Sequence, residues 1–366
     1  MKILLLGEYS NVHWTLATGL RQLGHTVTVV SDGDSWKNYQ RDISLKRKQG
    51  SLGTIRYLMK LAYTLPKLRG YDVVQLINPV FLSLKAERFY PIYDYLRRNN
   101  ELVFMGAFGM DHYWVKAGID CKTFRYSDFN LGKEIRHYKE NNIWINDWLL
   151  GEKGKLNQYI AHDCDGIISG LYEYHASYMP YFKDKLQYIP FPIDCSMHSY
   201  IPRGRNPKIN FFIGIQKARN EYKGTDIMLA ALKELIEKYP EQCQLTKVES
   251  VPYKQYCNLM DNCDVILDQL YSYTPAMNAL QAMAKGIIVV GGGEPENYEM
   301  LNEQEIHPII NVIPDQQDVF RKLEKLVLEQ DQLPRLSEES YHYVQKHHNH
   351  IRVAQQYLDF WISKAK

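Results

Sequence analysis

Short apolar runs that do not alternate with polar residues are the feature that most constrains the fold of this chain. The first covers residues 2–7 (KILLLG), and a helical pattern at 12–23 leads to a second run at 26–30 (TVTVV). Strands that are apolar on both faces belong to parallel sheets with helices on both sides. The sequence therefore predicts an α/β protein. Further strands are expected at 72–77, 101–105, 165–169 and 186–189.

The same pattern starts again in the second half of the chain. A strand is expected at 208–214 and a strongly amphipathic helix at 225–238. The stretch between the halves, 189–207, holds four prolines and little periodicity, which is typical of a linker. A chain of 366 residues is long enough for two domains. Weaker strands of the second half are expected at 244–248, 264–268, 287–291 and 308–312.

We therefore expect two doubly wound, Rossmann-like domains that face each other across a cleft and bind ligands at the carboxyl ends of their strands. The first would cover residues 1–195 and the second residues 196–345. One long helical pattern runs over residues 337–364. We expect the C-terminal helix, residues 346–366, to cross back to the first domain and pack near the domain junction.

Composition argues against several classes of protein. The net charge of +2 gives no global field that would attract nucleic acid. The six cysteines show no CxxC spacing, so we expect free thiols rather than a zinc or redox site. The first residues lack the features of a signal peptide, and no run of about 18 apolar residues is present. We expect a cytoplasmic protein without a nucleic-acid partner.

Neither a metal nor a dinucleotide cofactor is expected. The histidines near the C-terminus do not have the spacing of H-E-x-x-H, and no D-x-D motif stands out. The loop after the first strand holds only Gly7 of a G-x-G-x-x-G fingerprint. The histidines in question are His342, His347, His348 and His350.

Two loops of the first half carry candidate catalytic groups. His13 follows the first strand, where it can act as a base or bind a substrate; a capping or exposed histidine is the alternative. Asp111 and His112 follow the strand at 101–105 and can orient a hydroxyl or accept its proton. A structured loop around a packed tryptophan is the alternative for this second loop. Loops at the ends of strands usually carry function, which favours the catalytic interpretation.

A basic loop after the first strand of the second half is a candidate anion site. Lys217, Arg219 and Lys223 crowd this loop, and a helix opens at Gly224-Thr225-Asp226. Lysine and arginine can neutralise the charge that grows on a leaving diphosphate without a metal. A solvated charged turn is the alternative.

The stretch ALQAMAKGIIVVGGGEPENYE, residues 279–299, reads as a helix, a buried strand and a glycine-rich loop ending in acidic residues. Tyr273-Thr274-Pro275 precedes it and is typical of a helix start, with Thr274 as the cap. Free amides at a helix start can hold a diphosphate, and glycines let backbone approach a ligand. An ordinary βαβ crossover with a glycine turn is the alternative.

Residues 37–69 form a basic region with nine Lys/Arg and one acid. Its helical part interleaves Arg56 and Lys60 with apolar residues such as Met59 and Tyr63. A basic amphipathic helix can lie on an anionic membrane surface. This would make the protein peripheral at the inner face of the membrane. A surface helix packed on the sheet is the alternative.

Together these segments resemble the GT-B glycosyltransferases, most closely the large retaining family 4. The segment 165–194 is similar to the last strand, helix and "IPNGVD" linker of that family's first domain, and Lys223-Gly224 stands where the family has its diphosphate-binding cations. QAMAKGIIVVGGGEPE is similar to the family's "EAMACGxPVV…GGxxE". The family has two glutamates eight positions apart here, and this chain has Tyr273 and Gln281 instead.

The resemblance implies a role for each candidate in binding a nucleotide-diphosphate sugar. The donor diphosphate would contact Lys217, Arg219, Lys223, Ala276 and Met277. The ribose and donor sugar would contact Tyr273, Gln281, Gly293, Glu294 and Glu296, where the two glutamates would replace the missing carboxylates. The acceptor would meet the first domain near His13, Asp111 and His112.

We therefore expect a metal-independent, hexosyltransferase-type, retaining enzyme. It would move a sugar from a nucleotide-diphosphate sugar to a glycan or lipid-linked acceptor in polysaccharide or glycoconjugate synthesis. Two alternatives remain open at this point. One is a nucleotide-sugar epimerase of the same fold, and the other is a non-catalytic nucleotide-sugar binding protein.

Overall fold

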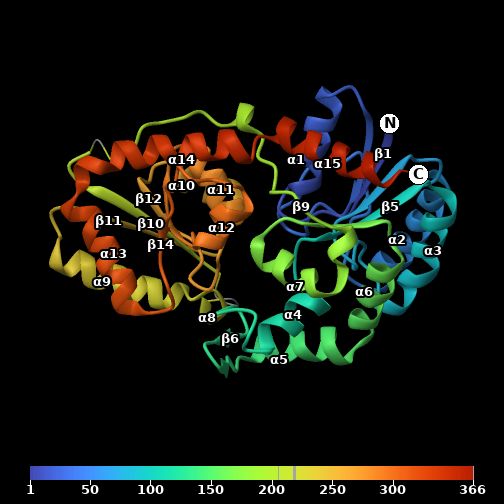
Figure 1. Cartoon of the computed structure of the whole chain (residues 1–366), viewed down its shortest axis with the longest axis horizontal. Coiled ribbons are helices and arrows are strands. Elements are labelled where there is room, and N and C mark those ends of the chain that lie inside the picture. The colour runs from blue at the N-terminus through green and yellow to red at the C-terminus, as the bar shows by residue number, and fades with distance from the viewer. Residues whose placement is uncertain (205, 217–219, 366) are drawn as a thin grey trace. The chain divides into compact units, whose positions relative to one another are not determined.

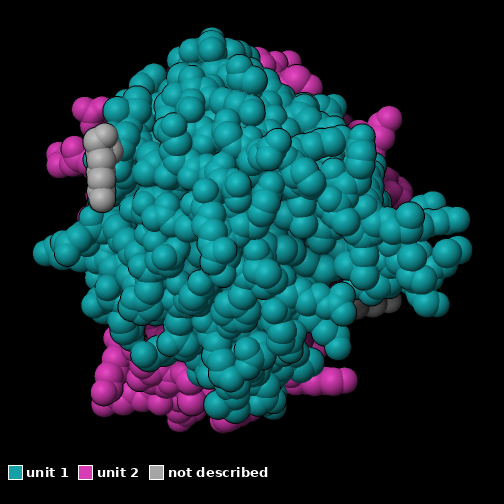
Figure 2. Space-filling view, turned by 90° about the vertical axis from the view of Figure 1, so that its right-hand side faces the viewer, with its two compact units in different colours: residues 1–116, 142–194, 350–366 teal, residues 117–141, 195–349 magenta. Residues whose placement is uncertain are grey.

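A computed structural model describes residues 1–204, 206–216 and 220–365 (Figure 1). These residues form two compact units, coloured teal and magenta in Figure 2. Unit 1 holds Met1–Lys116, Asn142–Asp194 and His350–Lys366, and unit 2 holds Ala117–Asn141 and Cys195–Asn349.

Unit 1 is built on a seven-stranded sheet in the order β3-β2-β1-β4-β5-β8-β9, with every neighbouring pair parallel. The strands of its centre are buried on both faces, as their unbroken apolar runs require. The strands are β1 (Lys2–Leu6), β2 (Thr26–Ser31), β3 (Ile43–Ser44), β4 (Val73–Leu76), β5 (Leu102–Ala107), β8 (Gly166–Ser169) and β9 (Leu186–Tyr188).

Helices connect these strands and cover the sheet. Each crossover joins parallel strands, so the chain must cross the sheet face between them. The helices are α1 (Val12–Gln22), α2 (Ser51–Thr64), α3 (Phe89–Asn99), α4 (His112–Ile119), α5 (Lys139–Ile145), α6 (Glu152–Asp163), α7 (Tyr172–Phe182) and α15 (His350–Lys364). A short π-helical turn, Asn146–Leu150, lies between α5 and α6.

Unit 2 repeats the plan with a five-stranded parallel sheet in the order β11-β10-β12-β13-β14. Its strands are β10 (Ile209–Ile215), β11 (Cys243–Glu249), β12 (Val265–Leu267), β13 (Ile288–Gly291) and β14 (Ile310–Asn311). Its helices are α8 (Asn220–Lys223), α9 (Thr225–Lys238), α10 (Tyr253–Met260), α11 (Met277–Met283), α12 (Pro295–Met300), α13 (Gln316–Leu328) and α14 (Leu333–His347). The predicted α/β class with two doubly wound halves is therefore confirmed.

The prediction of one continuous helix over 337–364 is wrong. α14 ends at His347, and α15 begins at His350. His348 leaves the helical conformation (φ −115°, ψ 4°), and the backbone N–H of His350 donates to the carbonyl of Ile193. This bond replaces a helical one, so the chain passes from unit 2 into unit 1 at this break.

Residues 117–141, which we call the arm, group with unit 2, although we placed them in a first domain of residues 1–195. The arm runs from the end of α4 to the start of α5 and contains a small antiparallel hairpin, β6 (Asn130–Leu131) and β7 (Glu134–Ile135). Its contacts run to unit-2 residues such as Tyr222 and Glu294. Sequence periodicity cannot show that the arm belongs to unit 2, because most of the arm has no regular secondary structure.

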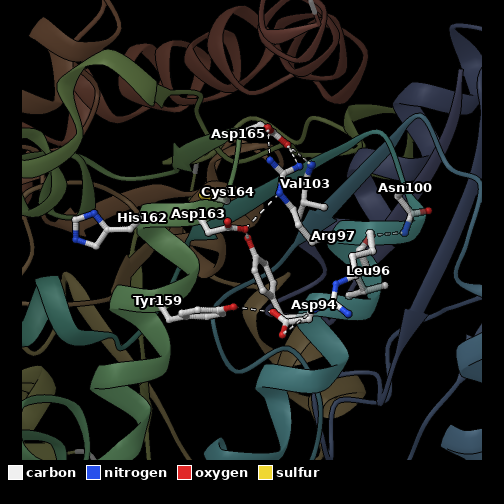
Figure 3. Close-up of polar contacts among 12 residues, drawn as sticks. Asp94, Leu96, Arg97, Asn100, Val103, Tyr159, His162, Asp163, Cys164 and Asp165 are labelled. Carbon is white, nitrogen blue, oxygen red and sulfur yellow. Dashed lines mark hydrogen bonds and ion pairs between the residues drawn. The ribbon is translucent and has the colours of Figure 1, made fainter.

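Arg97 of α3 fixes the amino end of β8 (Figure 3). Its guanidinium forms two bonds to the Asp165 carboxylate, at 2.7 and 2.8 Å, and its Nε lies 3.3 Å from Asp163. Asp165 also accepts the backbone N–H of Val103, at the start of β5. The network therefore holds β5 and β8 together at their amino ends. Ligands of open α/β sheets bind at the opposite edge, at the carboxyl ends of the strands.

Among the described residues, no helix is long and apolar enough to cross a membrane.

Gly19→Ala should destabilise the protein, although alanine normally favours a helix over glycine by about 1 kcal/mol. A Cβ at Gly19 would lie 2.3 Å from the carbonyl oxygen of His350 and 2.9 Å from the Cβ of Ala354. α1 and α15 would have to separate, at a cost of about 1–3 kcal/mol. Thermal unfolding measures this loss, with the exposed Gln22→Ala of the same helix as control. An increase in melting temperature for Gly19→Ala would contradict the packing described.

Candidate functional site

The loop between β1 and α1 is organised by a buried carboxylate. Glu8 accepts the backbone N–H groups of His13 and Trp14, at 3.2 and 3.0 Å, and so satisfies donors at the start of α1. Burial raises the pKa of Glu8 to about 8. Sequence analysis did not single out Glu8, although its position directly after a buried strand was a usable signal.

His13 is fully buried, so the alternative of an exposed histidine is wrong. Its Nδ1 lies 2.8 Å from the carbonyl oxygen of Gly7, and burial lowers the pKa of His13 far below its ordinary value, to about 3. The ring is therefore neutral, with Nδ1–H as the donor to Gly7. Among the described residues no group pairs with Nε2, which is left as a buried acceptor.

Asp111 and His112, in the loop after β5, are held by the scaffold of unit 1. The Asp111 carboxylate is fully buried and accepts the N–H of Trp114 and the O–H of Tyr178, both at 2.8 Å. Burial raises the pKa of Asp111 to about 7. His112 places Nδ1 2.8 Å from the carbonyl oxygen of Trp148, and burial lowers the pKa of its ring.

The structure brings the two predicted loops of unit 1 together around Tyr9. A Cβ on Gly109 would lie 3.3 Å from the Tyr9 ring, and the charge of Asp111 contributes to the raised pKa of Tyr9. Asp34, after β2, joins this edge by accepting the N–H of Ser10 at 2.8 Å. Hydrogen-bond acceptors therefore gather at the carboxyl ends of β1, β2 and β5, and a catalytic role for His13 and Asp111 stays a prediction.

Of the basic loop in unit 2, Lys217 and Arg219 lie outside the described residues. Lys223 ends the short helix α8, and its carbonyl accepts the N–H of Leu270 at 3.0 Å. Gly224 follows with φ +71°, and a Cβ there would lie 2.7 Å from the Cβ of Leu270. Glycine is therefore needed to turn the chain into α9 against the end of the neighbouring strand.

The glycine-rich loop after β13 packs against the loop that follows β12. A Cβ on Gly292 would lie 2.3 Å from the carbonyl oxygen of Ser272, which only glycine allows. The N–H of Glu294 donates to the carbonyl of Tyr273 at 3.0 Å, and that of Gly293 donates to the Asn311 side chain at 3.0 Å. These glycines therefore bring two protein loops together, which is what the alternative of an ordinary crossover predicts.

α11 begins two residues later than expected, so Thr274 is not its cap. Ala276 takes the N-cap position with an extended backbone, and its side chain makes no cap hydrogen bond. Thr274 is buried, and its carbonyl accepts the hydroxyl of Ser272 at 2.6 Å. This bond keeps residues 272–274 in a turn ahead of the helix.

Gln281, on α11, has its side-chain oxygen bonded to the hydroxyl of Tyr253 at 2.9 Å. Its amide N–H₂ group remains the part of the side chain that could donate to a ligand. The neighbouring Asn278 donates to Asp268, at the end of β12, at 2.8 Å.

One residue of the arm, Arg125, contacts three residues that were predicted to bind the donor sugar: Tyr273, Glu294 and Glu296. Arg125 donates its backbone N–H to the Tyr273 hydroxyl at 2.7 Å, and its guanidinium lies 4.7 Å from the centre of that ring. The guanidinium also donates to both oxygens of Glu296 and, at 3.0 Å, to Glu294. The hydroxyl of Tyr126 donates to the other oxygen of Glu294.

The charges of this cluster stabilise one another. Burial by itself would raise the pKa of Glu296, but the hydrogen bond and charge of Arg125, together with a backbone hydrogen bond, more than offset burial and lower it. The hydrogen bond to Glu296 also raises the pKa of Arg125. Arg125 and Tyr126 were missed by sequence analysis, and the sequence holds no signal for them, because Arg125 lies 148 positions before Tyr273.

The other end of the arm is fixed to the basic loop. Arg136 is buried and donates to the backbone carbonyl of Glu221 at 2.7 Å, and its guanidinium lies 3.2 Å from the centre of the Tyr271 ring. Asp128 accepts the hydroxyl of Tyr222 at 2.5 Å. The arm therefore contacts both loops that we predicted to bind the donor.

In the described part of the chain, no group of three His, Cys, Asp or Glu side chains is arranged to hold a metal ion. Metal independence of a reaction stays a prediction.

The second half of the chain matches a known family. Residues 214–359 fit the family model described as glycosyl transferase-like. Comparison with curated protein sequences found no match.

Solved structures of GT-B glycosyltransferases share the fold of the whole chain. HepE of Anabaena, in complex with UDP and glucose, superposes with a TM-score of 0.62 at 12% identity, covering 99% of this chain and 100% of its own. Sucrose-phosphate synthase from Thermosynechococcus elongatus gives 0.62 at 12% identity and 99% coverage of both chains. WaaG, a glycosyltransferase involved in lipopolysaccharide biosynthesis, gives 0.57 at 13% identity, covering 98% and 99%.

The resemblance to the GT-B glycosyltransferases is therefore confirmed. The chain has their fold over almost its full length, and residues 214–359 carry the glycosyl transferase-like family match. Membership of the retaining family 4 stays a prediction.

Asp111→Asn should gain stability relative to the wild type as the pH rises from about 4 to about 7. The folded protein keeps a proton on Asp111 up to a pKa of about 7, whereas an unfolded aspartate ionises near pH 4. The wild type therefore loses stability across this window, by up to about 1.4 kcal/mol per pH unit, and asparagine does not. Urea unfolding at several pH values measures the difference. Glu101→Gln, at an exposed carboxylate, is the control; a constant difference for Asp111→Asn would contradict the prediction.

Proposed function

We propose that this protein is a glycosyltransferase that moves a sugar from a nucleotide-diphosphate sugar to a glycan or lipid-linked acceptor. The observation that carries the proposal is the coincidence of a GT-B fold over nearly the whole chain with a glycosyl transferase-like match over residues 214–359. A neighbour of the same fold is described in complex with UDP-glucose, which supports a nucleotide-sugar donor here. The reaction would be of the hexosyl type, with retention of configuration and without a metal.

The donor would bind at the carboxyl ends of β10, β12 and β13 in unit 2, as ligands of open α/β sheets do. Lys217, Arg219 and Lys223 would neutralise the diphosphate. The backbone amides of Ala276 and Met277, at the start of α11, would assist them, and Ala276 has no side-chain group that caps this helix. The ribose would meet Gln281 through its amide.

The acceptor would bind in unit 1, where the loops after β1 and β5 gather His13, Asp111 and His112. His13 offers a neutral Nε2 as an acceptor, and Asp111 can ionise near neutral pH. A group whose pKa lies near the working pH is suited to accept a proton from an attacking hydroxyl.

A non-catalytic nucleotide-sugar binding protein is the second candidate, because one specific observation favours it. Tyr273 stands where the resembling family has a glutamate, and its hydroxyl already accepts the N–H of Arg125. Glu294 and Glu296 lie beside it and are the carboxylates that an active enzyme would use instead. Turnover of a bound nucleotide sugar with an acceptor separates the two candidates.

Lys223→Ala should weaken the binding of UDP about ten-fold, because a lysine paired with a phosphate contributes on the order of 1–2 kcal/mol. Isothermal titration calorimetry with UDP measures the change. Lys322→Ala is the matched control, since Lys322 is an exposed lysine on α13. Unchanged UDP affinity in Lys223→Ala would show that the diphosphate binds elsewhere.

We also propose a peripheral contact of unit 1 with an anionic membrane surface through α2. One face of this helix packs on the unit through Tyr57 and Leu61, so the alternative of a packed surface helix is correct for that face. The opposite face exposes Ile55, Met59 and Tyr63, with exposed fractions of 55%, 67% and 70%. Exposed apolar side chains flanked by basic ones match the headgroup region of an anionic bilayer. The six free cysteines are compatible with a cytoplasmic location at its inner face.

Reversing two charges, in Arg56→Glu/Lys60→Glu, should reduce binding to phosphatidylglycerol vesicles about ten-fold or more, because each basic residue near such a surface contributes about 1 kcal/mol. Both residues are exposed on α2. Vesicle co-sedimentation measures binding. Lys133→Glu/Lys322→Glu makes the same change of charge at exposed positions of unit 2 and should bind like the wild type. Equal loss in both double variants would mean that net charge, rather than α2, governs the contact.

A further inference from the structure

We propose that Arg125 is a positioning residue for the donor sugar: from the arm, it holds Glu294 and Glu296 beside Tyr273 as a pair of oriented carboxylates. The inference rests on the proposed function and adds to it a residue outside the segment that matches the glycosyl transferase-like family. It also gives the arm a role in selecting the sugar rather than the nucleotide.

The geometry of the guanidinium supports a positioning role. Its two terminal nitrogens span both oxygens of Glu296, in the paired arrangement that fits a planar guanidinium to a carboxylate. The same Nη2 reaches Glu294 at 3.0 Å. One side chain thus fixes the orientation of two carboxylates, and each carboxylate oxygen keeps a second lone pair that can accept from a sugar hydroxyl.

The charge balance also requires a cation here. Two carboxylates in contact with one group repel each other, and one of them tends to take up a proton when no cation is near. Arg125 removes this tendency, and its bond lowers the pKa of Glu296 against the effect of burial. The cluster of Arg125, Glu294 and Glu296 then keeps a net charge of about −1, which suits hydroxyl donors.

The arm that presents Arg125 is a packed part of unit 2. Phe124 and Tyr126, on either side of Arg125, are 2% and 4% exposed, and Phe129 is fully buried. Arg136 ties the far end of the arm to the carbonyl of Glu221. The side chain of Arg125 itself is 55% exposed, so it is fixed by its neighbours and still open to solvent. Such a residue is preorganised for a ligand.

The test compares UDP with UDP-glucose as calorimetric probes of the full chain. In Arg125→Ala, the affinity for UDP-glucose should fall about ten-fold while the affinity for UDP changes less than about two-fold. Arg125→Lys should recover part of the loss, because lysine restores the charge but not the paired geometry. Lys133→Ala, at an exposed lysine of the same arm, is the matched control and should bind both probes like the wild type.

A pH series adds a readout that a purely structural role would not move. Without Arg125, burial should raise the pKa of Glu296, so the advantage of UDP-glucose over UDP should weaken further as the pH falls from about 7 to about 5. The wild type should keep this advantage over the same range, because its Glu296 stays ionised.

Three results would overturn the inference, and they are distinguishable. An unchanged ratio of the two affinities in Arg125→Ala means that Arg125 does not position sugar-binding groups. Tighter UDP-glucose binding in that variant means that Arg125 competes with the sugar for Glu294 and Glu296. Binding of neither probe by the wild type means that a UDP-sugar is not the donor, and this inference fails with it.

Discussion

The central strands of both sheets are buried on both faces, and this constraint governs where ligands can be bound. Strands such as β1 and β13 present apolar side chains to helices on either side, so no binding group can come from their middle. The candidate binding groups described above lie where the strands end or in the loops that follow them. In unit 1 these ends carry Glu8 and Asp111, and in unit 2 they carry Lys223 and the glycine-rich loop.

Close backbone contact then shapes the candidate donor site in unit 2. Gly292 allows the loop after β13 to touch Ser272, and the N–H of Glu294 bonds to the carbonyl of Tyr273. The acidic residues that follow are thereby placed next to the tyrosine that replaces a family glutamate. Arg125 completes the arrangement from a distant part of the chain, so the chemistry of the site is shared between the arm and the two loops.

The sequence predicted the fold well because the central strands are continuous apolar runs, most of them followed by a helix. The runs at 26–30 and 287–291 became β2 and β13 almost without change of bounds. Boundaries that depend on tertiary bonds were less predictable. The helical pattern at 337–364 continues through His348, so the sequence alone does not show that a helix ends there. The break depends on the hydrogen bond from the His350 N–H to the Ile193 carbonyl, which joins residues far apart in the sequence. Thr274 is not the helix cap, because it lies in a turn ahead of α11, where its carbonyl accepts the Ser272 hydroxyl.

By itself, the sequence determined the α/β class, the alternation of strands and helices along the chain and the loops in which candidate residues lie, because these follow from local periodicity and from residue type. Only the tertiary structure decided what those residues meet. It buried His13 against Gly7, fixed Asp111 to Tyr178, and joined Arg125 to Glu296 across 171 positions of sequence. Such hydrogen bonds and ion pairs cannot be recognised from the periodicity of a sequence. They depend on which distant segments pack together rather than on which residues are neighbours in the chain.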